Sequence, residues 1–393
     1  MPTLSSRMGT LPPYPLAHIP QKKRELLARG VDLIDLGAGD ADLAPPPAAL
    51  EGMARALKEP AMHRYGFGLG HVPFREAASR YMQDRFGQRF DPLTEIVPLI
   101  GSKEGLAHLA FAYLNPGDVA IIPEPGYQAY VGGTLLALGE PYAVPLKAEH
   151  DFLVELDQVP ADVLKRAKMV YVNYPNNPTA AIAPRAYLER LVARCRTLGL
   201  LLVYDNAYAE LAFDGYVPPS IFEIEGARDC AIEFHSLSKT FNMTGWRCAW
   251  AVAAPPIAGA LARIKSFTDT GPFMAIQAAG VAALDSWRTF VPLNVAVFQR
   301  RRDAAVAAFR EAGFAVESPK ASMYLWIPLP SGVASKEFAD RLMDNEGVVV
   351  LPGSGFGAGG EGYFRISFIQ TEARLAEAAR RAGRVLAAFG AAV

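Results

Sequence analysis

The sequence has few cysteines and no segment typical of export. Its three cysteines, Cys195, Cys230 and Cys248, form no C-x-x-C pair and are odd in number. We therefore expect buried thiols and not disulfides or metal ligands, in a reducing compartment, most simply the cytoplasm. The first twenty residues, Met1–Pro20, carry prolines where a signal peptide needs an apolar run.

Strong net charge, long apolar runs and metal-binding spacings are also missing. The formal net charge is −1 without long runs of like charge, so we expect no nucleic-acid partner. The longest apolar stretch, around Ala249–Ala262, is interrupted by Pro255-Pro256 and is too short to span a bilayer. The six histidines are scattered, so we expect no metal site. This profile is typical of a globular enzyme.

One glycine motif is not expected to carry chemistry. Gly355, Gly357 and Gly360 satisfy G-x-G-x-x-G, which indicates dinucleotide binding only between a strand and a helix. An expected strand, Tyr363–Phe368, follows almost at once, so we interpret the motif as a flexible loop. No Walker A, H-E-x-x-H or G-x-S-x-G sequence is present.

Short apolar runs alternate with helical patterns over most of the 393 residues. Strands that are apolar on both faces and separated by helices indicate a mostly parallel sheet, and hence an α/β fold. Expected strands include Val119–Ile122, Met169–Asn173, Leu200–Tyr204, Ala231–His235 and Ala249–Ala253, with a helix at Pro184–Leu198. In such sheets the chemistry gathers beyond the carboxyl ends of the strands.

The pattern changes after Trp287 and predicts a second, smaller α+β domain. A helix at Asn294–Ala312 precedes strands at Met323–Pro328, Val348–Leu351 and Tyr363–Phe368 and a terminal helix. The proline-rich first 45 residues are expected to lie against it. We thus predict a large domain at residues 46–288 and a small domain from residues 1–45 and 289–393.

Lys239 is the first candidate for chemistry. It follows a strand in Phe234-His235-Ser236-Leu237-Ser238-Lys239-Thr240, and Gly245-Trp246-Arg247 comes next. A lysine past a strand end can form a Schiff base, and Arg247 with the hydroxyl groups can neutralise a phosphate. Alone, Lys239 is an ordinary loop lysine, but the spacing to Ser236 and Arg247 favours the functional interpretation.

Asp205 ends the apolar strand Leu200–Tyr204, and Tyr208 follows three residues later. A buried carboxylate needs a proton or a cation. The plain interpretation is a helix N-cap. The functional one is a carboxylate facing a protonated pyridine nitrogen, with the tyrosine hydroxyl on the phenolic oxygen of the same ring.

Three further segments have both plain and functional interpretations. Asn177, in Tyr174-Pro175-Asn176-Asn177-Pro178, lies in a turn-rich stretch. Ser102 and Lys103 begin a helix, where free amides attract anions and where an ordinary N-cap is equally expected. Arg365 lies in a strand among aromatic residues. At a sheet edge it would be solvated; the alternative is that its guanidinium forms two parallel hydrogen bonds with a carboxylate.

These segments, in this order, resemble the class I/II aminotransferases over nearly the whole chain. The resemblance implies the fold-type I architecture, with a mostly parallel seven-stranded sheet in the large domain, and pyridoxal 5′-phosphate as cofactor. It implies that Lys239 carries the cofactor as a Schiff base and that Asp205 pairs with the pyridine nitrogen. The other expected contacts to the cofactor are Ser102, Lys103, Tyr127, Asn177, Tyr208, Ser236 and Arg247, with Tyr65 reaching the phosphate of a partner subunit. The expected substrate contacts are Arg365, on the α-carboxylate, with Gly39, Asn177 and Tyr14.

The narrower resemblance is to bacterial LL-diaminopimelate aminotransferases and their alanine aminotransferase relatives. It rests on Leu11–Pro15, Gly101–Gly105, Tyr174–Ala181 and Glu233–Arg247. The sequence departs from this group at Ala41, where proline is usual, and at Arg247-Cys248-Ala249-Trp250, where a small apolar residue and glycine are usual.

The resemblance implies transfer of an amino group from an L-amino acid, with LL-2,6-diaminopimelate the best candidate, to 2-oxoglutarate by a homodimer with shared active sites. Alanine or aspartate as donor, and a lyase that eliminates a β- or γ-substituent, stay open, because one fold hosts many reactions. An effector-sensing domain of a transcription regulator would need an attached DNA-binding region, and none is visible.

Overall fold

The computed structural model describes residues 2–12, 17–68 and 70–390. Its main feature is a seven-stranded sheet with the order β2-β8-β7-β6-β5-β3-β4. The strands are β2 (Ile96–Leu99), β3 (Val119–Glu124), β4 (Glu140–Pro145), β5 (Ala167–Asn173), β6 (Leu201–Asp205), β7 (Ala231–Ser236) and β8 (Ala249–Ala253). Neighbouring strands from β4 to β7 are parallel, and β8 runs antiparallel to β2 and β7. The predicted α/β fold with a mostly parallel seven-stranded sheet is confirmed.

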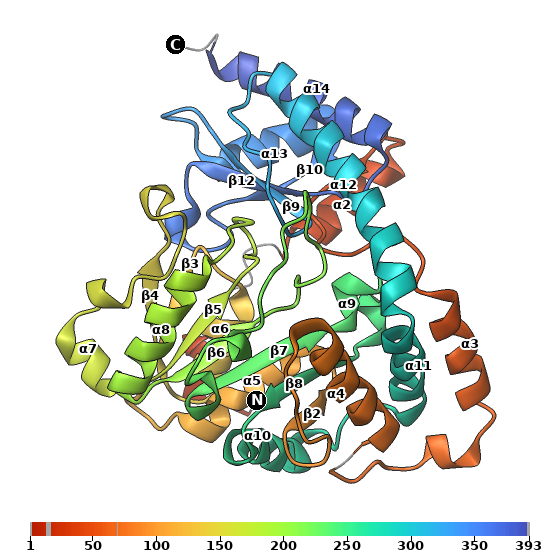
Figure 1. Cartoon of the computed structure of the whole chain (residues 1–393). Helices are drawn as coiled ribbons and strands as arrows, with labels where there is room; N and C mark the ends of the chain where they lie inside the picture. Colours follow the sequence, from red (N-terminus) through yellow and green to blue (C-terminus); the bar gives the residue numbers. More distant parts are fainter. Residues whose placement is uncertain (1, 13–16, 69, 391–393) are drawn as a thin grey trace.

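Both faces of this sheet are covered by helices (Figure 1). One face packs against α5 (Ser102–Tyr113), α6 (Gln128–Leu136) and α10 (Pro255–Thr268). The other packs against α4 (Val72–Phe86), α7 (Ala161–Arg166), α8 (Arg185–Leu198) and α11 (Met274–Asp285), with α3 (Pro47–Ala56) lying on α11. Apart from the edge strand β4, the strands are buried almost throughout on both sides, which explains why they read as continuous apolar runs.

A second layer of strands and helices lies above one end of the large sheet (Figure 1). Its three-stranded antiparallel sheet has the order β11-β12-β9, from β9 (Tyr324–Pro328), β11 (Leu351–Pro352) and β12 (Tyr363–Ser367). A parallel pair joins β1 (Ile34–Asp35) to β10 (Val348–Val349). The helices of this layer include α2 (Ile19–Ala28), α13 (Ser335–Glu346) and α14 (Glu372–Gly390). Two short helices lie elsewhere: α1 (Ser6–Thr10) contacts α6, and α9 (Leu237–Thr240) follows β7. The domain boundaries at residues 46 and 289 stay a prediction.

Two elements differ from the sequence-based expectation. The helix expected at Asn294–Ala312 is α12 (Trp287–Glu311), which begins seven residues earlier and contains Pro292. A proline inside a helix loses one backbone hydrogen bond, but Val291 and Asn294 are buried and hold the first turns against the large domain. The single strand expected at Val348–Leu351 is two short strands, because β10 pairs with β1 and β11 pairs with β12.

Within the described residues, none of the helices combines the length and the apolar character that crossing a membrane requires.

Candidate active site

A cavity of about 530 Å³ lies where three neighbouring parallel strands end. Asn173, Asp205 and Ser236 are the last residues of β5, β6 and β7, and all three line the cavity. The first residues of α5, the N-terminal segment around Gly39 and the three-stranded sheet complete its wall. The carboxyl ends of parallel strands therefore form the cavity, as expected for such sheets.

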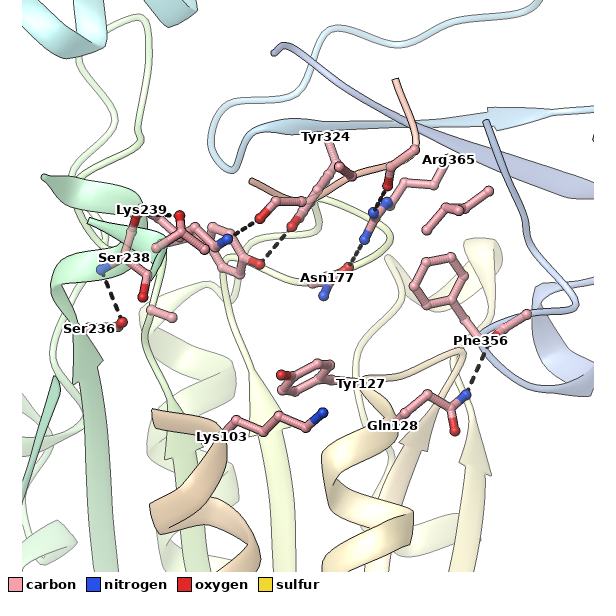
Figure 2. A pocket seen from close by; sticks show the side chains of 18 of the residues that line it. Lys103, Tyr127, Gln128, Asn177, Ser236, Ser238, Lys239, Tyr324, Phe356 and Arg365 are labelled. Carbon is pink, nitrogen blue, oxygen red and sulfur yellow. Dashed lines mark hydrogen bonds between the residues drawn. The ribbon is translucent and has the colours of Figure 1, made fainter. Parts of the chain in front are cut away.

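The cavity brings together nearly all the residues that the sequence predicted. Those lining it are Gly39, Ser102, Lys103, Tyr127, Asn177, Asp205, Tyr208, Ser236, Lys239, Arg247 and Arg365. Figure 2 shows Lys103 and Tyr127 on the side opposite Tyr324 and Arg365, with Lys239 at one end of the group. Tyr65 does not line the cavity of its own subunit. Tyr14 lies outside the described residues.

Lys239 lies in the short helix α9, directly after β7, and its amine donates a hydrogen bond to the carbonyl of Gly39 (Figure 2). Burial lowers the pKa of Lys239 below that of an ordinary lysine. Tyr324 and Asp40 oppose this effect, and the charges of Arg365 and Arg247 add to it. A lower pKa leaves more of the amine neutral, as nucleophilic attack on a carbonyl requires.

Asp205 is a buried carboxylate with a hydrogen-bond partner for only one of its two oxygens. Its Oδ2 accepts a hydrogen bond of 2.8 Å from the hydroxyl of Tyr130. Its Oδ1 is buried and has no hydrogen-bond partner among the residues that the structure describes. Burial raises the pKa of Asp205 to about 6, against the opposing effect of the Tyr130 hydrogen bond. Such an oxygen at a cavity wall is suited to a cation or a protonated nitrogen.

Asn173 holds the neighbouring segments in register. Its side-chain amide donates to the backbone carbonyl of Asp205 at 2.7 Å, and its oxygen accepts from the amide of Asn177 at 2.7 Å. The side-chain oxygen of Asn177 in turn accepts a hydrogen bond of 2.7 Å from Nη1 of Arg365. The turn that follows β5 is therefore tied to the three-stranded sheet across the cavity.

Arg247 lies against the beginning of α5. Gly101 stands at the N-cap of α5, and a Cβ added there would lie 2.1 Å from Nη2 of Arg247. The φ of +72° at Gly101 favours glycine, and a side chain at this position would displace the guanidinium from the start of the helix. The arginine, the helix N-terminus at Ser102 and the hydroxyl of Ser236 offer the charge and the donors that bind a phosphate.

Arg365 was expected either at a solvated sheet edge or on a carboxylate, and the structure excludes the first. It lies in β12, the central strand of its sheet, and is 4% exposed. Its Nη2 donates to the carbonyl of Gly37 at 2.7 Å, and its Nε is buried without a partner within the described chain. The guanidinium lies 4.0 Å from the ring centroid of Tyr324 and 4.9 Å from that of Phe356. A buried arginine with an unused donor can hold an anionic ligand.

Sequence reasoning missed several residues in or behind the cavity wall. Tyr130, which lies behind the wall and bonds Asp205, follows Tyr127 by three residues, and this spacing at the start of α6 could have suggested a shared helix face. Tyr324, Gln128 and Phe356 line the cavity, but no spacing in the sequence marks them. Lys23 on α2 pairs with Asp35, whose Oδ1 accepts from the amide of Gly37 at 2.9 Å.

The G-x-G-x-x-G segment forms part of this wall and does not precede a helix of the Rossmann type. It contains a short turn of 3-10 helix at Ala358–Gly360 and leads into β12. The carbonyl of Gly355 accepts from Gln128 at 3.1 Å (Figure 2). The amide of Gly359 donates to Glu124 at 3.1 Å. The loop thus joins the two sheets at the cavity.

Glu104, His108 and Asp269 also cluster, with ligand atoms close enough for a cation. Lys265, however, places its amine 2.8 Å from Glu104 and 3.0 Å from Asp269. An ammonium group already neutralises these carboxylates, so the cluster is an ion-pair network.

The cavity residues fit pyridoxal 5′-phosphate, the cofactor expected from the sequence. The buried, unpartnered oxygen of Asp205 suits a protonated ring nitrogen. Arg247 and the start of α5 suit a phosphate, and the amine of Lys239 suits an aldehyde. The volume is within the range of small-molecule sites.

Comparison with known proteins agrees with this fit. The family model described as aminotransferase class I and II matches residues 31–381. An LL-diaminopimelate aminotransferase of Nitratidesulfovibrio vulgaris is 46% identical over 383 residues, which cover 97% of this chain and 99% of the relative. Among solved structures, substrate-bound BacF from Bacillus subtilis has a TM-score of 0.93 at 34% identity, covering 98% of each chain. A probable N-succinyldiaminopimelate aminotransferase from Thermus thermophilus has a TM-score of 0.90 at 36% identity, covering 94% of this chain and all of the other.

Proposed function

The chain belongs to the class I and II aminotransferases and is a pyridoxal 5′-phosphate-dependent transaminase, and from this premise we propose that its amino donor is LL-2,6-diaminopimelate. The proposed acceptor is 2-oxoglutarate, and the proposed role is in lysine biosynthesis. The names of the relatives at 44–46% identity over 96–97% of the chain support this donor.

The observation that carries the proposal is the number of charged and polar groups in the cavity beyond Arg365. Lys23, Asp35 and Gln128 all line it. Diaminopimelate has an ammonium and a carboxylate at each end, so a donor of this kind can use polar groups of both signs far from the reacting carbon. Alanine has no distal group that could interact with any of them.

We assign the cofactor contacts by the same chemistry. Asp205 faces the ring nitrogen, Tyr208 and Asn177 bind the phenolic oxygen, and Tyr127 stacks on the ring. The phosphate is held by Ser102, Lys103, Ser236 and Arg247. When bound, pyridoxal 5′-phosphate supplies an electron sink that stabilises negative charge at the substrate Cα.

The proposed work of the protein is to orient the substrate and to move one proton. Arg365, helped by Gly39 and Asn177, holds the α-carboxylate so that the Cα proton lies near Lys239. The amine of Lys239 would act as the base that removes this proton. Its lowered pKa leaves more of the amine in the neutral, basic form than in an ordinary lysine.

We also propose that the active unit is a homodimer. Tyr65 is 73% exposed and its ring lies 5.2 Å from that of Phe67, which is 75% exposed. Neither lines the cavity of its own subunit. Two large neighbouring rings left in water support a partner surface, and Tyr65 is the residue expected to reach the partner's phosphate.

A reducing compartment, most simply the cytoplasm, is supported by the cysteines. Cys195, Cys230 and Cys248 are all buried and unpaired within the described chain, and burial raises the pKa of each thiol. Such thiols are poorly reactive and form no structural crosslink.

A donor panel tests the substrate. LL-diaminopimelate, alanine, aspartate and aromatic amino acids are each supplied with 2-oxoglutarate, and the glutamate formed is measured. LL-diaminopimelate should give the highest kcat/KM; equal values for another donor would overturn the assignment. With amino acid alone, a transaminase stops after one equivalent of 2-oxo acid per site, whereas a lyase continues to release product.

Lys239→Ala tests the base. The variant should lose turnover and the visible absorbance of the lysine-bound cofactor, while Lys168→Ala, on an exposed part of β5, should keep both. Steady-state activity in Lys239→Ala would contradict the assignment.

A further inference from the structure

Tyr324 contacts two different parts of the site. It is the first residue of β9 and is 2% exposed. Its hydroxyl lies 2.8 Å from the hydroxyl of Tyr208, and its ring lies under the guanidinium of Arg365, 4.0 Å from the ring centroid (Figure 2). One side chain therefore contacts both the tyrosine assigned to the cofactor oxygen and the arginine assigned to the substrate carboxylate.

The backbone of the N-terminal segment leaves room for this hydroxyl. A Cβ at Gly39 would lie 2.5 Å from Oη of Tyr324. The carbonyl of the same glycine accepts the hydrogen bond from Lys239. The Tyr324 hydroxyl is thus confined to a small space between Tyr208 and the backbone that contacts the reactive lysine.

The contact between the two hydroxyls has a defined direction when the cofactor is bound. A tyrosine hydroxyl has one proton to donate. If Tyr208 donates to the phenolic oxygen of the cofactor, it can only accept from Tyr324. Tyr324 then polarises Tyr208 and strengthens its donation, because hydrogen bonds in a chain reinforce one another.

The contact with Arg365 fixes the plane of the guanidinium. Asn177 and the carbonyl of Gly37 accept from its two terminal nitrogens, each at 2.7 Å. The ring of Tyr324 covers one part of the group, and Phe356 lies 4.9 Å away. A ring at this distance attracts the cation and keeps its plane oriented for a carboxylate.

We infer that Tyr324 is a positioning residue that acts on both half-sites, through its hydroxyl on Tyr208 and through its ring on Arg365. This inference rests on the proposed roles of Tyr208 and Arg365. The two contacts use different parts of one side chain, so two substitutions separate them.

Tyr324→Phe keeps the ring and removes the hydroxyl. Weaker donation by Tyr208 stabilises less negative charge on the phenolic oxygen, so the pH midpoint of the bound cofactor's absorbance should rise. The bond from Tyr208 remains and loses only its cooperative strengthening, about 10–30% of a hydrogen bond to a charged group, so the expected shift is about 0.1 to 0.7 pH unit. The KM values of both substrates should change less than about twofold, since the ring still faces Arg365.

Tyr324→Leu removes the hydroxyl and the ring together. It should shift the midpoint by the same amount and also raise the KM of the amino acid and of the 2-oxo acid by about 5- to 30-fold. If the leucine variant does not fold, Tyr324→Met serves the same purpose, because methionine also lacks both the ring and the hydroxyl.

Tyr187→Phe is the matched control, because Tyr187 is a buried tyrosine whose hydroxyl bonds a backbone carbonyl away from the cavity. It should lower Tm without moving the midpoint. An unchanged midpoint in Tyr324→Phe, or an equal shift in the control, overturns the role of the hydroxyl; an unchanged KM in the leucine variant overturns that of the ring. A wild-type protein without cofactor absorbance would instead refute the proposed function.

Discussion

The hydroxyl of Tyr130 donates to one oxygen of Asp205 at 2.8 Å and leaves the other oxygen of that buried carboxylate without a partner within the described chain. The hydrogen bond stabilises the charged form of Asp205, whereas burial opposes it. Tyr130 therefore keeps a carboxylate available for a cation in a place where an isolated carboxylate would be protonated.

Removing either partner of this pair should weaken catalysis to different degrees. Asp205→Asn, which cannot carry a negative charge, should lower kcat by about 100-fold or more. Tyr130→Phe should lower it by about 10-fold, in line with one hydrogen bond to a charged group. Steady-state kinetics measure both. Tyr171→Phe is the control, because its ring stacks on Tyr130 while its hydroxyl bonds the carbonyl of Leu106; an equal loss in this variant would contradict a specific role for Tyr130.

The stability of the cofactor-free protein should depend on pH through Asp205. Its pKa is about 6 in the folded protein and 3.8 in the unfolded chain, so the folded state binds the proton more tightly. The contribution to stability is present below pH 4 and is lost as the pH rises from about 4 to about 6, by about 3 kcal/mol in total. Thermal unfolding of the wild type and of Asp205→Asn, each without cofactor, measures this contribution. The difference in stability between the two proteins should change between pH 4 and pH 6. A constant difference from pH 4 to pH 7 would exclude the effect.

Arg365→Lys should damage the binding of both substrates. Lysine keeps the charge but lacks the planar guanidinium group. It therefore cannot bond Asn177 and Gly37 together, and it cannot bind a carboxylate through two parallel hydrogen bonds. We expect kcat/KM to fall by about 100-fold for the amino acid and the 2-oxo acid alike. Arg302→Lys, at another buried arginine, bound to Asp214, controls for general destabilisation. A loss confined to one substrate would argue against a shared carboxylate site.

Mixing two variants with weakened cofactor sites should restore some activity if the site is shared between subunits. Tyr65→Phe should weaken cofactor retention in the partner's site, and Arg247→Ala should weaken it in its own. In a mixed dimer one site carries both defects and the other carries neither. Re-associated mixtures should therefore regain up to about one quarter of wild-type activity, measured after subunit exchange. A fully active monomer, or no recovery in proven mixed dimers, would refute the shared site.

The sequence predicted the parts of the site that depend on strand ends. Asp205 and Ser236 each end a continuous apolar strand, so local pattern was enough to place them at one edge of a parallel sheet. The position of Lys239 followed, because it comes only three residues after Ser236. These predictions depend on short spacings along the chain.

Contacts between distant segments could not be predicted in the same way. The burial of Arg365 follows from strand order, which places β12 between β9 and β11, and order is set by tertiary packing. Tyr324 is a plain strand residue in the sequence, and its role depends on Tyr208, 116 residues away. The early start of α12 likewise depends on burial that overrides the proline in its second turn.

The hydrogen bond from Arg365 to Gly37 also sets a limit on when the site can form during synthesis. The two residues are 328 positions apart. At a translation rate of about 5 to 20 residues per second, the carbonyl of Gly37 waits roughly 16 to 66 s after its own synthesis before its partner exists. The ribosome-bound chain can complete the seven-stranded sheet during that time, but it cannot yet bind the substrate carboxylate because Arg365 has not been made. Amino-acid binding therefore reports that the last strand of the chain has been made and docked.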